Sequence, residues 1–215
     1  MSMFRTRVFC MMALILVLVA GSATAGSLSK GVKAGVNFAR VTNDFAGDSD
    51  HAMGIAAGLS LSYDLVPGFK IQPEILYVQQ GGKYDVTLFD SGGMPQGTGE
   101  LKWKLNYIQV PVLARLEVPV AGAILPAFMG GVAVSFKSGA TYELDAAASS
   151  NDGDLDDIKS TDLSLIMGMG FKFGAGPAGI IVDVRYVKGL NNINDSGTAV
   201  EVKNESIQAL AGFSF

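Results

Sequence analysis

The sequence has very little of what catalytic and metal-binding sites are usually made from. It contains one cysteine (Cys10), one histidine (His51) and one tryptophan. Cys10 lies in an apolar N-terminal run that we expect to be removed, so the mature chain would have no disulfide, thiol nucleophile or cysteine-based metal site. Neither a nucleophile elbow, a phosphate loop nor a cluster of metal ligands is visible. The sequence therefore predicts no catalytic, cofactor-binding or metal site.

Basic residues and long apolar runs are also scarce. The chain has 16 basic against 20 acidic residues and a formal net charge of −4. It lacks the basic field of a nucleic-acid-binding protein, so nucleic acid is not an expected partner. After Val8–Ala20, no apolar run approaches the ~20 residues that a membrane-spanning helix needs. If the mature protein lies in a membrane, it crosses as a closed barrel and not as helices.

The N-terminus has the pattern of a secretory signal. Arg5 and Arg7 precede the apolar run Val8–Ala20, and Ala23 and Ala25 stand at A-x-A positions. This pattern is typical of a signal peptide that is cut after Ala25. The alternative, a transmembrane anchor, is disfavoured because the run is shorter than ~20 residues. We expect residues 1–25 to be a signal peptide and residues 26–215 to form one barrel domain.

Alternation with a period of two runs through the mature chain. In the terminal segment Ser206–Phe215, Ile207, Phe213 and Phe215 share one apolar face. Such alternation predicts a β-strand with one apolar face. The closing strands of outer-membrane barrels carry aromatic residues at the lipid boundary. Eight segments follow this pattern: 30–40, 53–63, 69–84, 101–115, 124–136, 162–173, 180–186 and 206–215. In the fourth, the phase changes at Asn106–Ile108, which predicts either a β-bulge or a tyrosine turned inward.

The connections between these segments alternate in length. Asp64–Gly68, Pro119–Ala123 and Gly174–Ala178 are short and rich in glycine and proline, as tight turns are. The polar segments between them are long: 41–52, 85–98, 138–160 and 190–204. This alternation predicts an all-β fold, an eight-stranded antiparallel up-and-down transmembrane β-barrel with short periplasmic turns and long extracellular loops. We therefore expect the protein in the cell outer membrane, surrounded by outer-membrane lipid.

A soluble ligand-binding barrel is compatible with the same periodicity, because it keeps apolar residues inside and charges outside. The aromatic residues favour the membrane barrel, since they gather near strand ends on the apolar face, where interfacial girdles lie. The predicted lipid-interface aromatics are Tyr63, Tyr77, Trp103, Phe171, Phe173, Tyr186, Phe213 and Phe215.

The opposite face of the strands carries charges of both signs. At eight strands a barrel is filled by its own side chains, and inward charges must be paired because a lone buried charge is costly. We expect a structural salt-bridge plug in the lumen; a proton or ion path is the alternative. Its predicted members are Lys33, Lys70, Glu74, Arg115, Lys172, Asp183 and Arg185.

Two loop features allow other hypotheses. Asp152, Asp154 and Asp156 begin like a calcium loop, but Asp157 occupies the turn-glycine position and Leu163 the position of the bidentate glutamate. A solvated loop is the simpler interpretation, with weak divalent-cation binding as the alternative.

His51 follows Asp48, Ser49 and Asp50, which suggests a barrel hydrolase. A His–Asp pair, however, needs its acid on a different element to orient the ring. We therefore expect a protein that is not an enzyme.

Several stretches resemble the PorT-like family of outer-membrane β-barrel proteins of Gram-negative bacteria. They are GVKAGVNFA (31–39), IQPEILYVQQGGK (71–83), LNYIQVPVLARL (105–116), VDVRYVKGLNNIN (182–194) and the terminal AGFSF. One departure is Gln109, where the family usually has an acidic residue before the proline.

The resemblance implies an integral outer-membrane barrel without catalytic residues. It also implies that the C-terminal strand is the tag recognised by the barrel-assembly machinery, and that some relatives take part in type IX secretion. We expect a structural, surface-interaction or secretion-accessory role, with an unidentified protein partner at the extracellular loops. A small porin-like channel for ions or solutes is the first alternative, and a hydrolase using His51 is the second.

Overall fold

The computed structural model describes residues 28–43, 49–89, 92–120, 122–146, 149–155, 157–174, 178–197 and 200–215. The predicted signal peptide, residues 1–25, lies outside these ranges. The strands are β1 (Leu28–Asn43), β2 (Ala52–Val66), β3 (Phe69–Phe89), β4 (Pro95–Glu117), β5 (Ile124–Ala146), β6 (Ser149–Asp154), β7 (Thr161–Phe173), β8 (Gly179–Gly189) and β9 (Val202–Ser214). Among these residues no helix is long and apolar enough to cross a membrane.

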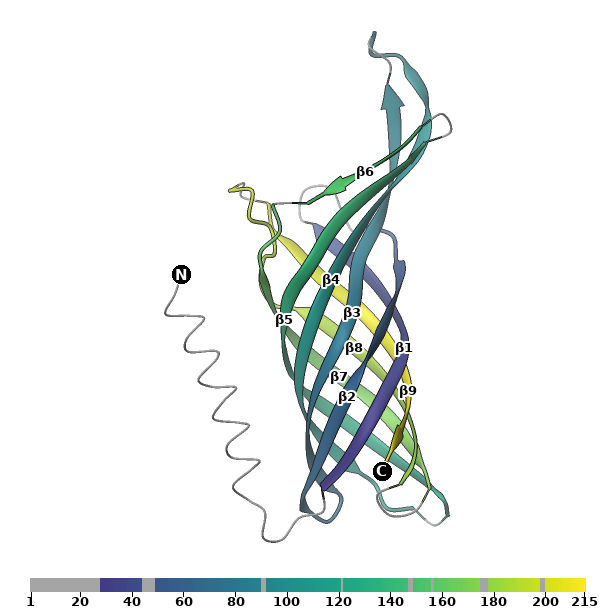
Figure 1. Cartoon of the computed structure of the whole chain (residues 1–215), viewed down its shortest axis with the longest axis vertical. Helices are drawn as coiled ribbons and strands as arrows, with labels where there is room; N and C mark the ends of the chain where they lie inside the picture. The colour runs from purple at the N-terminus through teal and green to yellow at the C-terminus, as the bar shows by residue number, and fades with distance from the viewer. Residues whose placement is uncertain are drawn as a thin grey trace.

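Eight of the nine strands close into an antiparallel up-and-down barrel (Figure 1). Neighbours in sequence pair from β1 to β5, β5 then pairs with β7, and the ring continues through β8 and β9. The seam is the pairing of β1 with β9, where Gly31 lies opposite Ser214 and Ala39 opposite Ser206. Closure leaves no free sheet edge around the ring. The predicted eight-stranded ring is confirmed.

The distribution of residue types over the two faces of the sheet is the reverse of that in a soluble protein. Large apolar side chains such as Leu59, Phe128 and Met167 are more than half exposed on the outside. Inside, polar and charged side chains such as Asn37, Gln72 and Arg185 are almost completely buried. An exposed apolar belt of this extent marks a surface that contacts other molecules or a membrane.

The two rims of the barrel differ. The turns β2–β3, β4–β5 and β7–β8 lie at one rim, together with the end of β9; we call it the short-turn rim (Figure 1). The opposite, long-loop rim carries the connection from β1 to β2, the long hairpins and the segment 190–201 between β8 and β9. This is the predicted alternation of connection lengths.

Several predicted loops are strands in the structure. β3 runs to Phe89, β4 starts at Pro95, β5 runs to Ala146 and β6 is an additional strand that pairs with β5 alone. Together, residues 81–89, 95–106, 139–146 and 149–154 form a sheet that projects beyond the long-loop rim, which we call the arm (Figure 1). The expected loops 85–98 and 138–160 are therefore wrong over most of their length, because cross-strand pairing continues past the barrel.

The phase change in the fourth predicted strand has a clear structural origin. β4 keeps one phase, with Leu105, Tyr107 and Gln109 all facing inward and fully buried. The tyrosine is thus turned inward, one of the two predicted alternatives. The register with β5 shifts between Asn106 and Tyr107, which leaves Ser138 as an extra residue on β5. The irregularity therefore lies on the partner strand, at the point where the barrel passes into the arm.

Candidate functional site

The centre of the lumen is filled by a network of buried ion pairs. Lys33 on β1 contacts Glu74 on β3 at 2.9 Å and Asp183 on β8 at 2.6 Å. Arg185 forms a forked pair with Glu74 through its two terminal nitrogens, at 2.6 and 2.8 Å, and also donates to Asp183 at 2.9 Å. Arg115 on β4 donates to Asp183 at 2.9 Å. The side chains of these five residues are at most 3% exposed, and we call them the central network.

The geometry of the central network fits what buried charges require. Three cations, on Lys33, Arg115 and Arg185, surround two carboxylates, and each carboxylate accepts from at least two cations. Gln72 adds a neutral donor to Glu74 at 2.6 Å. Charge-assisted and forked hydrogen bonds of this kind are the strong ones. The five groups together carry one net positive charge, and the carboxylate of Glu117 in the next layer lies 3.6 Å from Arg115 Nε.

A glycine on the neighbouring strand makes room for one carboxylate of the central network. Gly170 on β7 lies against Asp183, and a β-carbon built at Gly170 would come within 2.2 Å of Asp183 Oδ1. Any larger residue at this position would displace the carboxylate from its partners. The inward glycine of β7 is therefore part of the central network's packing.

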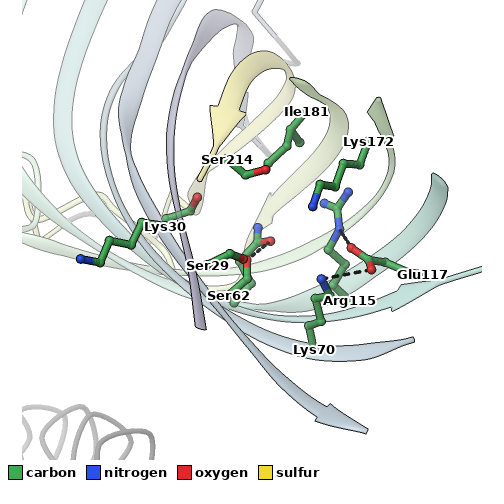
Figure 2. Close-up of a pocket in the computed structure, with 11 residues that line it drawn as sticks. Ser29, Lys30, Ser62, Lys70, Arg115, Glu117, Lys172, Ile181 and Ser214 are labelled. Atoms are coloured by element: carbon green, nitrogen blue, oxygen red, sulfur yellow. Dashed lines mark hydrogen bonds and ion pairs between the residues drawn. The ribbon is translucent and has the colours of Figure 1, made fainter. Parts of the chain in front are cut away.

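A second group of charges lies toward the short-turn rim. Lys70 contacts Glu117 at 3.1 Å and Asp64 at 3.2 Å, and Arg115 Nε lies 3.6 Å from Glu117. Figure 2 shows this pocket, with Lys172 directed toward Arg115 on one side. The free space inside is only about 10 Å³, enough for roughly one water molecule. This pocket is therefore too small for a ligand larger than water.

All seven predicted lumen charges thus face the barrel interior or its mouth, five of them in one network. Sequence reasoning missed Glu117, the main partner of Lys70. Its position was a usable signal, because Glu117 stands two residues after the inward Arg115 on one strand and therefore shares its face.

Above the central network, toward the long-loop rim, the lumen is lined mainly by neutral polar side chains. Gln208 on β9 donates to Gln109 on β4 at 3.3 Å, and Gln109 donates to Ser135 on β5 at 3.4 Å. Gln109 thus takes part in a neutral layer instead of the ion pair that an acidic residue would form. One step higher, Asn204 donates to Asp162 at 3.0 Å. The alternation of these residues with outward apolar ones predicts that they lie inside the barrel, but it does not predict which residues they bind.

An apolar cluster closes the lumen at the long-loop rim. Its fully buried members include Val41, Leu105 and Tyr107 from the strands. Ile158 and Ile193 come from the connections that precede β7 and β9, and they are 7% and 0% exposed. The two connections pair with each other through an isolated bridge between Ile158 and Asn194. The long loops thus fold into the mouth of the barrel and cover it.

The aromatic residues divide into two groups. Phe171, Phe173, Phe213 and Phe215 lie on the outer face close to the short-turn rim and are 40–55% exposed. The rings of Phe213 and Phe215 stack with centroids 6.3 Å apart. Tyr77 and Tyr186 are partly exposed, whereas Tyr63 is 9% exposed. A position of these residues at the lipid boundary stays a prediction.

Trp103 differs from its predicted position at the lipid interface. Because the odd-numbered residues of β4 face inward, Trp103 packs against the apolar cluster in the barrel mouth. Its indole also meets Tyr84 edge-on, with ring centroids 5.7 Å apart. Assigning Trp103 to the lipid interface was therefore an error, caused by placing the odd residues of this strand on the outer face.

The other face of the arm carries a ladder of exposed ion pairs. Lys102 contacts Glu100 at 3.0 Å and Asp145 at 2.7 Å, and Lys104 pairs with Glu143. The hydrogen bonds to Asp145 and Glu100 raise the pKa of Lys102, and its proximity lowers the pKa of both carboxyls. Each such surface pair contributes little, typically below about 1 kcal/mol. Their joint effect is to favour one register between the arm strands.

The two loop hypotheses receive little support. His51 is exposed directly before β2, and no hydrogen bond or ion pair among the described residues holds its ring against an acid. Asp48 and Asp156 lie outside the described residues. Asp152 and Asp154 are exposed on β6, and the described residues contain no group of three or more metal-ligating side chains.

Three solved structures of outer-membrane proteins are similar to this chain at low sequence identity. Neisserial surface protein A (NspA) is 15% identical, with 89% of this chain and 99% of that chain covered and a TM-score of 0.47. Ail, the attachment invasion locus protein of Yersinia pestis, is 16% identical over 87% and 98%, with a TM-score of 0.43. The outer membrane enzyme PagL is 16% identical over 85% and 97%, with a TM-score of 0.41. At such identities a likeness concerns the fold and not the role.

The search among curated proteins gives no match. A family model, described as outer membrane protein beta-barrel domain, matches residues 21–195. The match covers most of the chain and includes the strands of the central network. The chain therefore belongs to the outer membrane protein beta-barrel domain family, and its location is the outer membrane.

Proposed function

We propose that this protein is a non-conducting, non-enzymatic outer-membrane barrel whose role is carried by the structure at its long-loop rim. The observation that carries the proposal is the contrast between the two parts of the molecule. The lumen is closed at several levels by paired side chains, whereas three barrel strands continue outward as the arm. The barrel is the support, and the arm and the loops beside it are the working surface.

The closed lumen argues against the porin-like alternative. A permeating ion would have to displace Arg185 from both Glu74 and Asp183, and then pass the glutamine layer and the apolar cluster. Breaking buried ion pairs by separating the partners costs several kcal/mol. An eight-stranded barrel has an interior just wide enough for its own side chains. The ion path considered from the sequence is blocked by the same charges that suggested it.

The hydrolase alternative lacks the geometry that it needs. A general base requires a partner that orients it and a nucleophile within hydrogen-bond distance. His51 is exposed on a chain segment whose neighbours make backbone contacts, with Asp50 bridging to Lys83. The family alone does not decide this question, since PagL is an outer membrane enzyme. Our proposal of a non-enzymatic role rests on the surroundings of His51.

The orientation follows from the fold and the location. In barrels of the bacterial outer membrane the short turns face the periplasm and the long loops face outward. The arm would then project from the cell surface, where it would meet a protein partner. The narrower PorT-like resemblance adds a secretion-accessory role as a second form of the proposal. The C-terminal strand, paired with β1 along its length, would be the segment that the assembly machinery handles, and the leader up to about Ala25 would be removed.

Planar-bilayer conductance tests the closed lumen. We expect the purified full-length barrel to show no steady channel. An open porin reconstituted in parallel is the positive control, and a variant with Lys33, Glu74, Asp183 and Arg185 all replaced by serine should stay closed as well, because the glutamine layer and the apolar cluster remain. A steady channel in the unaltered protein would overturn the proposal.

A photo-crosslinking residue tests the working surface in intact outer membranes. Asp85 on the arm is a suitable position, and Val120 in a turn of the short-turn rim is the matched control, since both are exposed. We expect protein adducts at position 85 on the outer side of the membrane. Adducts confined to position 120 would place the working surface at the periplasmic rim instead.

A further inference from the structure

A hollow of about 420 Å³ lies at the base of the arm, on the side that faces the barrel mouth. Its walls come from β4, the end of β6 and the two connections that cover the lumen. The volume falls in the range of about 300–1,000 Å³ that is usual for small-ligand pockets. The eight lining residues are Trp103, Asp154, Leu155, Asp157, Ile158, Asn194, Ser196 and Val202.

The walls of the hollow are fixed by backbone hydrogen bonds. Asp195 N donates to the carbonyl of Asp157 at 2.9 Å, and Lys159 N donates to that of Ile193 at 2.8 Å. These bonds tie the two connections to each other. Leu155 N donates to the carbonyl of Ala140 at 3.0 Å, which ties the first connection to the arm. The hollow is therefore preformed, which lowers the entropic cost of binding.

The lining combines an apolar floor with negative charge at the edge. Leu155, Ile158 and Val202 are apolar, and the indole of Trp103 is half-buried beside them. Asp154 and Asp157 are exposed at the edge, and neither forms an ion pair within the described residues. Two lysines bind the backbone of these connections and not the two carboxylates: Lys159 Nζ donates to the carbonyl of Asn192 at 2.9 Å, and Lys137 Nζ donates to that of Ile158 at 2.6 Å.

The opposite side of β4 offers a contrast of similar size. A hollow of about 450 Å³ there is lined by Lys83, Lys102 and Lys104, and Trp103 lies between the two hollows. Lysines on that side are paired with arm carboxylates, whereas Asp154 and Asp157 have no cationic partner among the residues that the structure describes. The ladder side is thus balanced within itself, whereas the side that faces the mouth presents carboxylates that suit a cation.

We propose that the hollow beside Trp103 binds a small organic cation, an ammonium group carried on a short apolar body. The two unpaired carboxylates would meet the ammonium, and the apolar floor would bury the body. An aromatic ring within about 6 Å of a cation adds roughly 0.5–1 kcal/mol at an exposed site, and tryptophan is the best such ring. The inference rests on the proposed function, which puts this rim at the cell surface.

The test uses the single tryptophan of the chain as its own reporter. Full-length protein in nanodiscs of neutral phosphatidylcholine is titrated with pentylammonium at pH 7, and Trp103 emission is followed. Pentanol and pentanoate are the matched neutral and anionic probes. We expect a saturable change with pentylammonium alone, weakened by added salt because the contact is ionic. An equal response to pentanol or pentanoate would overturn the proposal, and so would the absence of saturation.

Variants assign the binding to the carboxylates. The double change Asp154→Asn and Asp157→Asn should weaken pentylammonium binding at least ten-fold. Asp152→Asn is the control, because Asp152 is exposed on the same strand but does not line the hollow. Equal loss in both variants would mean a general charge effect and would overturn the site. The same saturation with Ca²⁺ alone would replace it by a metal site. Conductance does not enter this assay, so its failure is distinguishable from failure of the proposed function.

Discussion

Replacing Glu74 by glutamine should destabilise the barrel more than any other change of one charge that we consider. The side chain of Glu74 is fully buried and accepts from Lys33, from Gln72 and twice from Arg185. Glutamine keeps the shape but removes the charge, and it turns an amide donor toward one of the donors. The central network would then hold three cations against one carboxylate. Removing one partner of a buried ion pair costs about 3–5 kcal/mol, and we expect a loss of this size.

The measurement is a urea titration of the barrel in lipid vesicles, with the folded fraction read from the faster migration of unheated protein on gels. Glu143→Gln is the matched control, because it makes the same chemical change in an exposed pair of the arm and should cost below about 1 kcal/mol. Adding Lys33→Met to Glu74→Gln should restore part of the stability, since the excess cation goes with the carboxylate. Equal small losses in Glu74→Gln and Glu143→Gln would refute the reasoning.

Three further predictions concern other parts of the molecule. Gly35→Ala should destabilise the seam, because the new β-carbon would lie 1.9 Å from a backbone oxygen of β9. Gly130→Ala leaves 3.7 Å to the nearest atom, so it should stabilise the barrel by about 0.5–1 kcal/mol. The same urea titration compares the two variants. Deleting Phe215 removes its two backbone hydrogen bonds to β1 and its stacked ring, so the yield of folded barrel in the outer membrane should fall. Lys102→Met should raise the pKa of Asp145 toward 3.8, which an NMR titration would measure. The pKa of Asp145 is lower in the folded protein than in the unfolded chain. The ion pair therefore stabilises the folded protein above pH 3.8, and this stabilisation is lost as the pH falls through the lowered pKa.

The barrel could be predicted from the sequence because its physical cause is local. Each barrel strand places apolar side chains against lipid and small or polar side chains in the lumen, so apolar and polar residues alternate along its sequence. The same rule placed the predicted charges inside and joined the first strand to the last. Strand number and closure followed from counting segments and connections.

The arm was missed because its strands do not obey that rule. Outside the membrane neither face has to be apolar, and residues 92–99 contain four glycines and one proline, which normally indicate a loop. Backbone pairing simply continues past the barrel, and charged side chains such as Lys102 and Asp145 pair across it. Such pairing depends on register, and register between distant segments is not visible in a single sequence.

The cover of the barrel mouth could not be predicted from the sequence either. Ile158 and Ile193 are isolated apolar residues in polar segments, so they carry no periodic signal. Their burial follows from the bridge between the two connections. The hollow beside Trp103 depends on the same bridge and on the inward phase of β4, which the sequence left open.

The continuity of β4 has a consequence for how a partner would meet this protein. The strand runs without interruption through 23 residues, roughly 75 Å, from the arm to the short-turn rim. No linker separates the arm from the barrel, because β4 and β5 stay paired on both sides of the extra residue Ser138. The arm therefore points in a set direction relative to the bilayer. The angle at which a partner approaches the arm is therefore set by the barrel, and only rotation of the barrel about the membrane normal changes the direction of the arm.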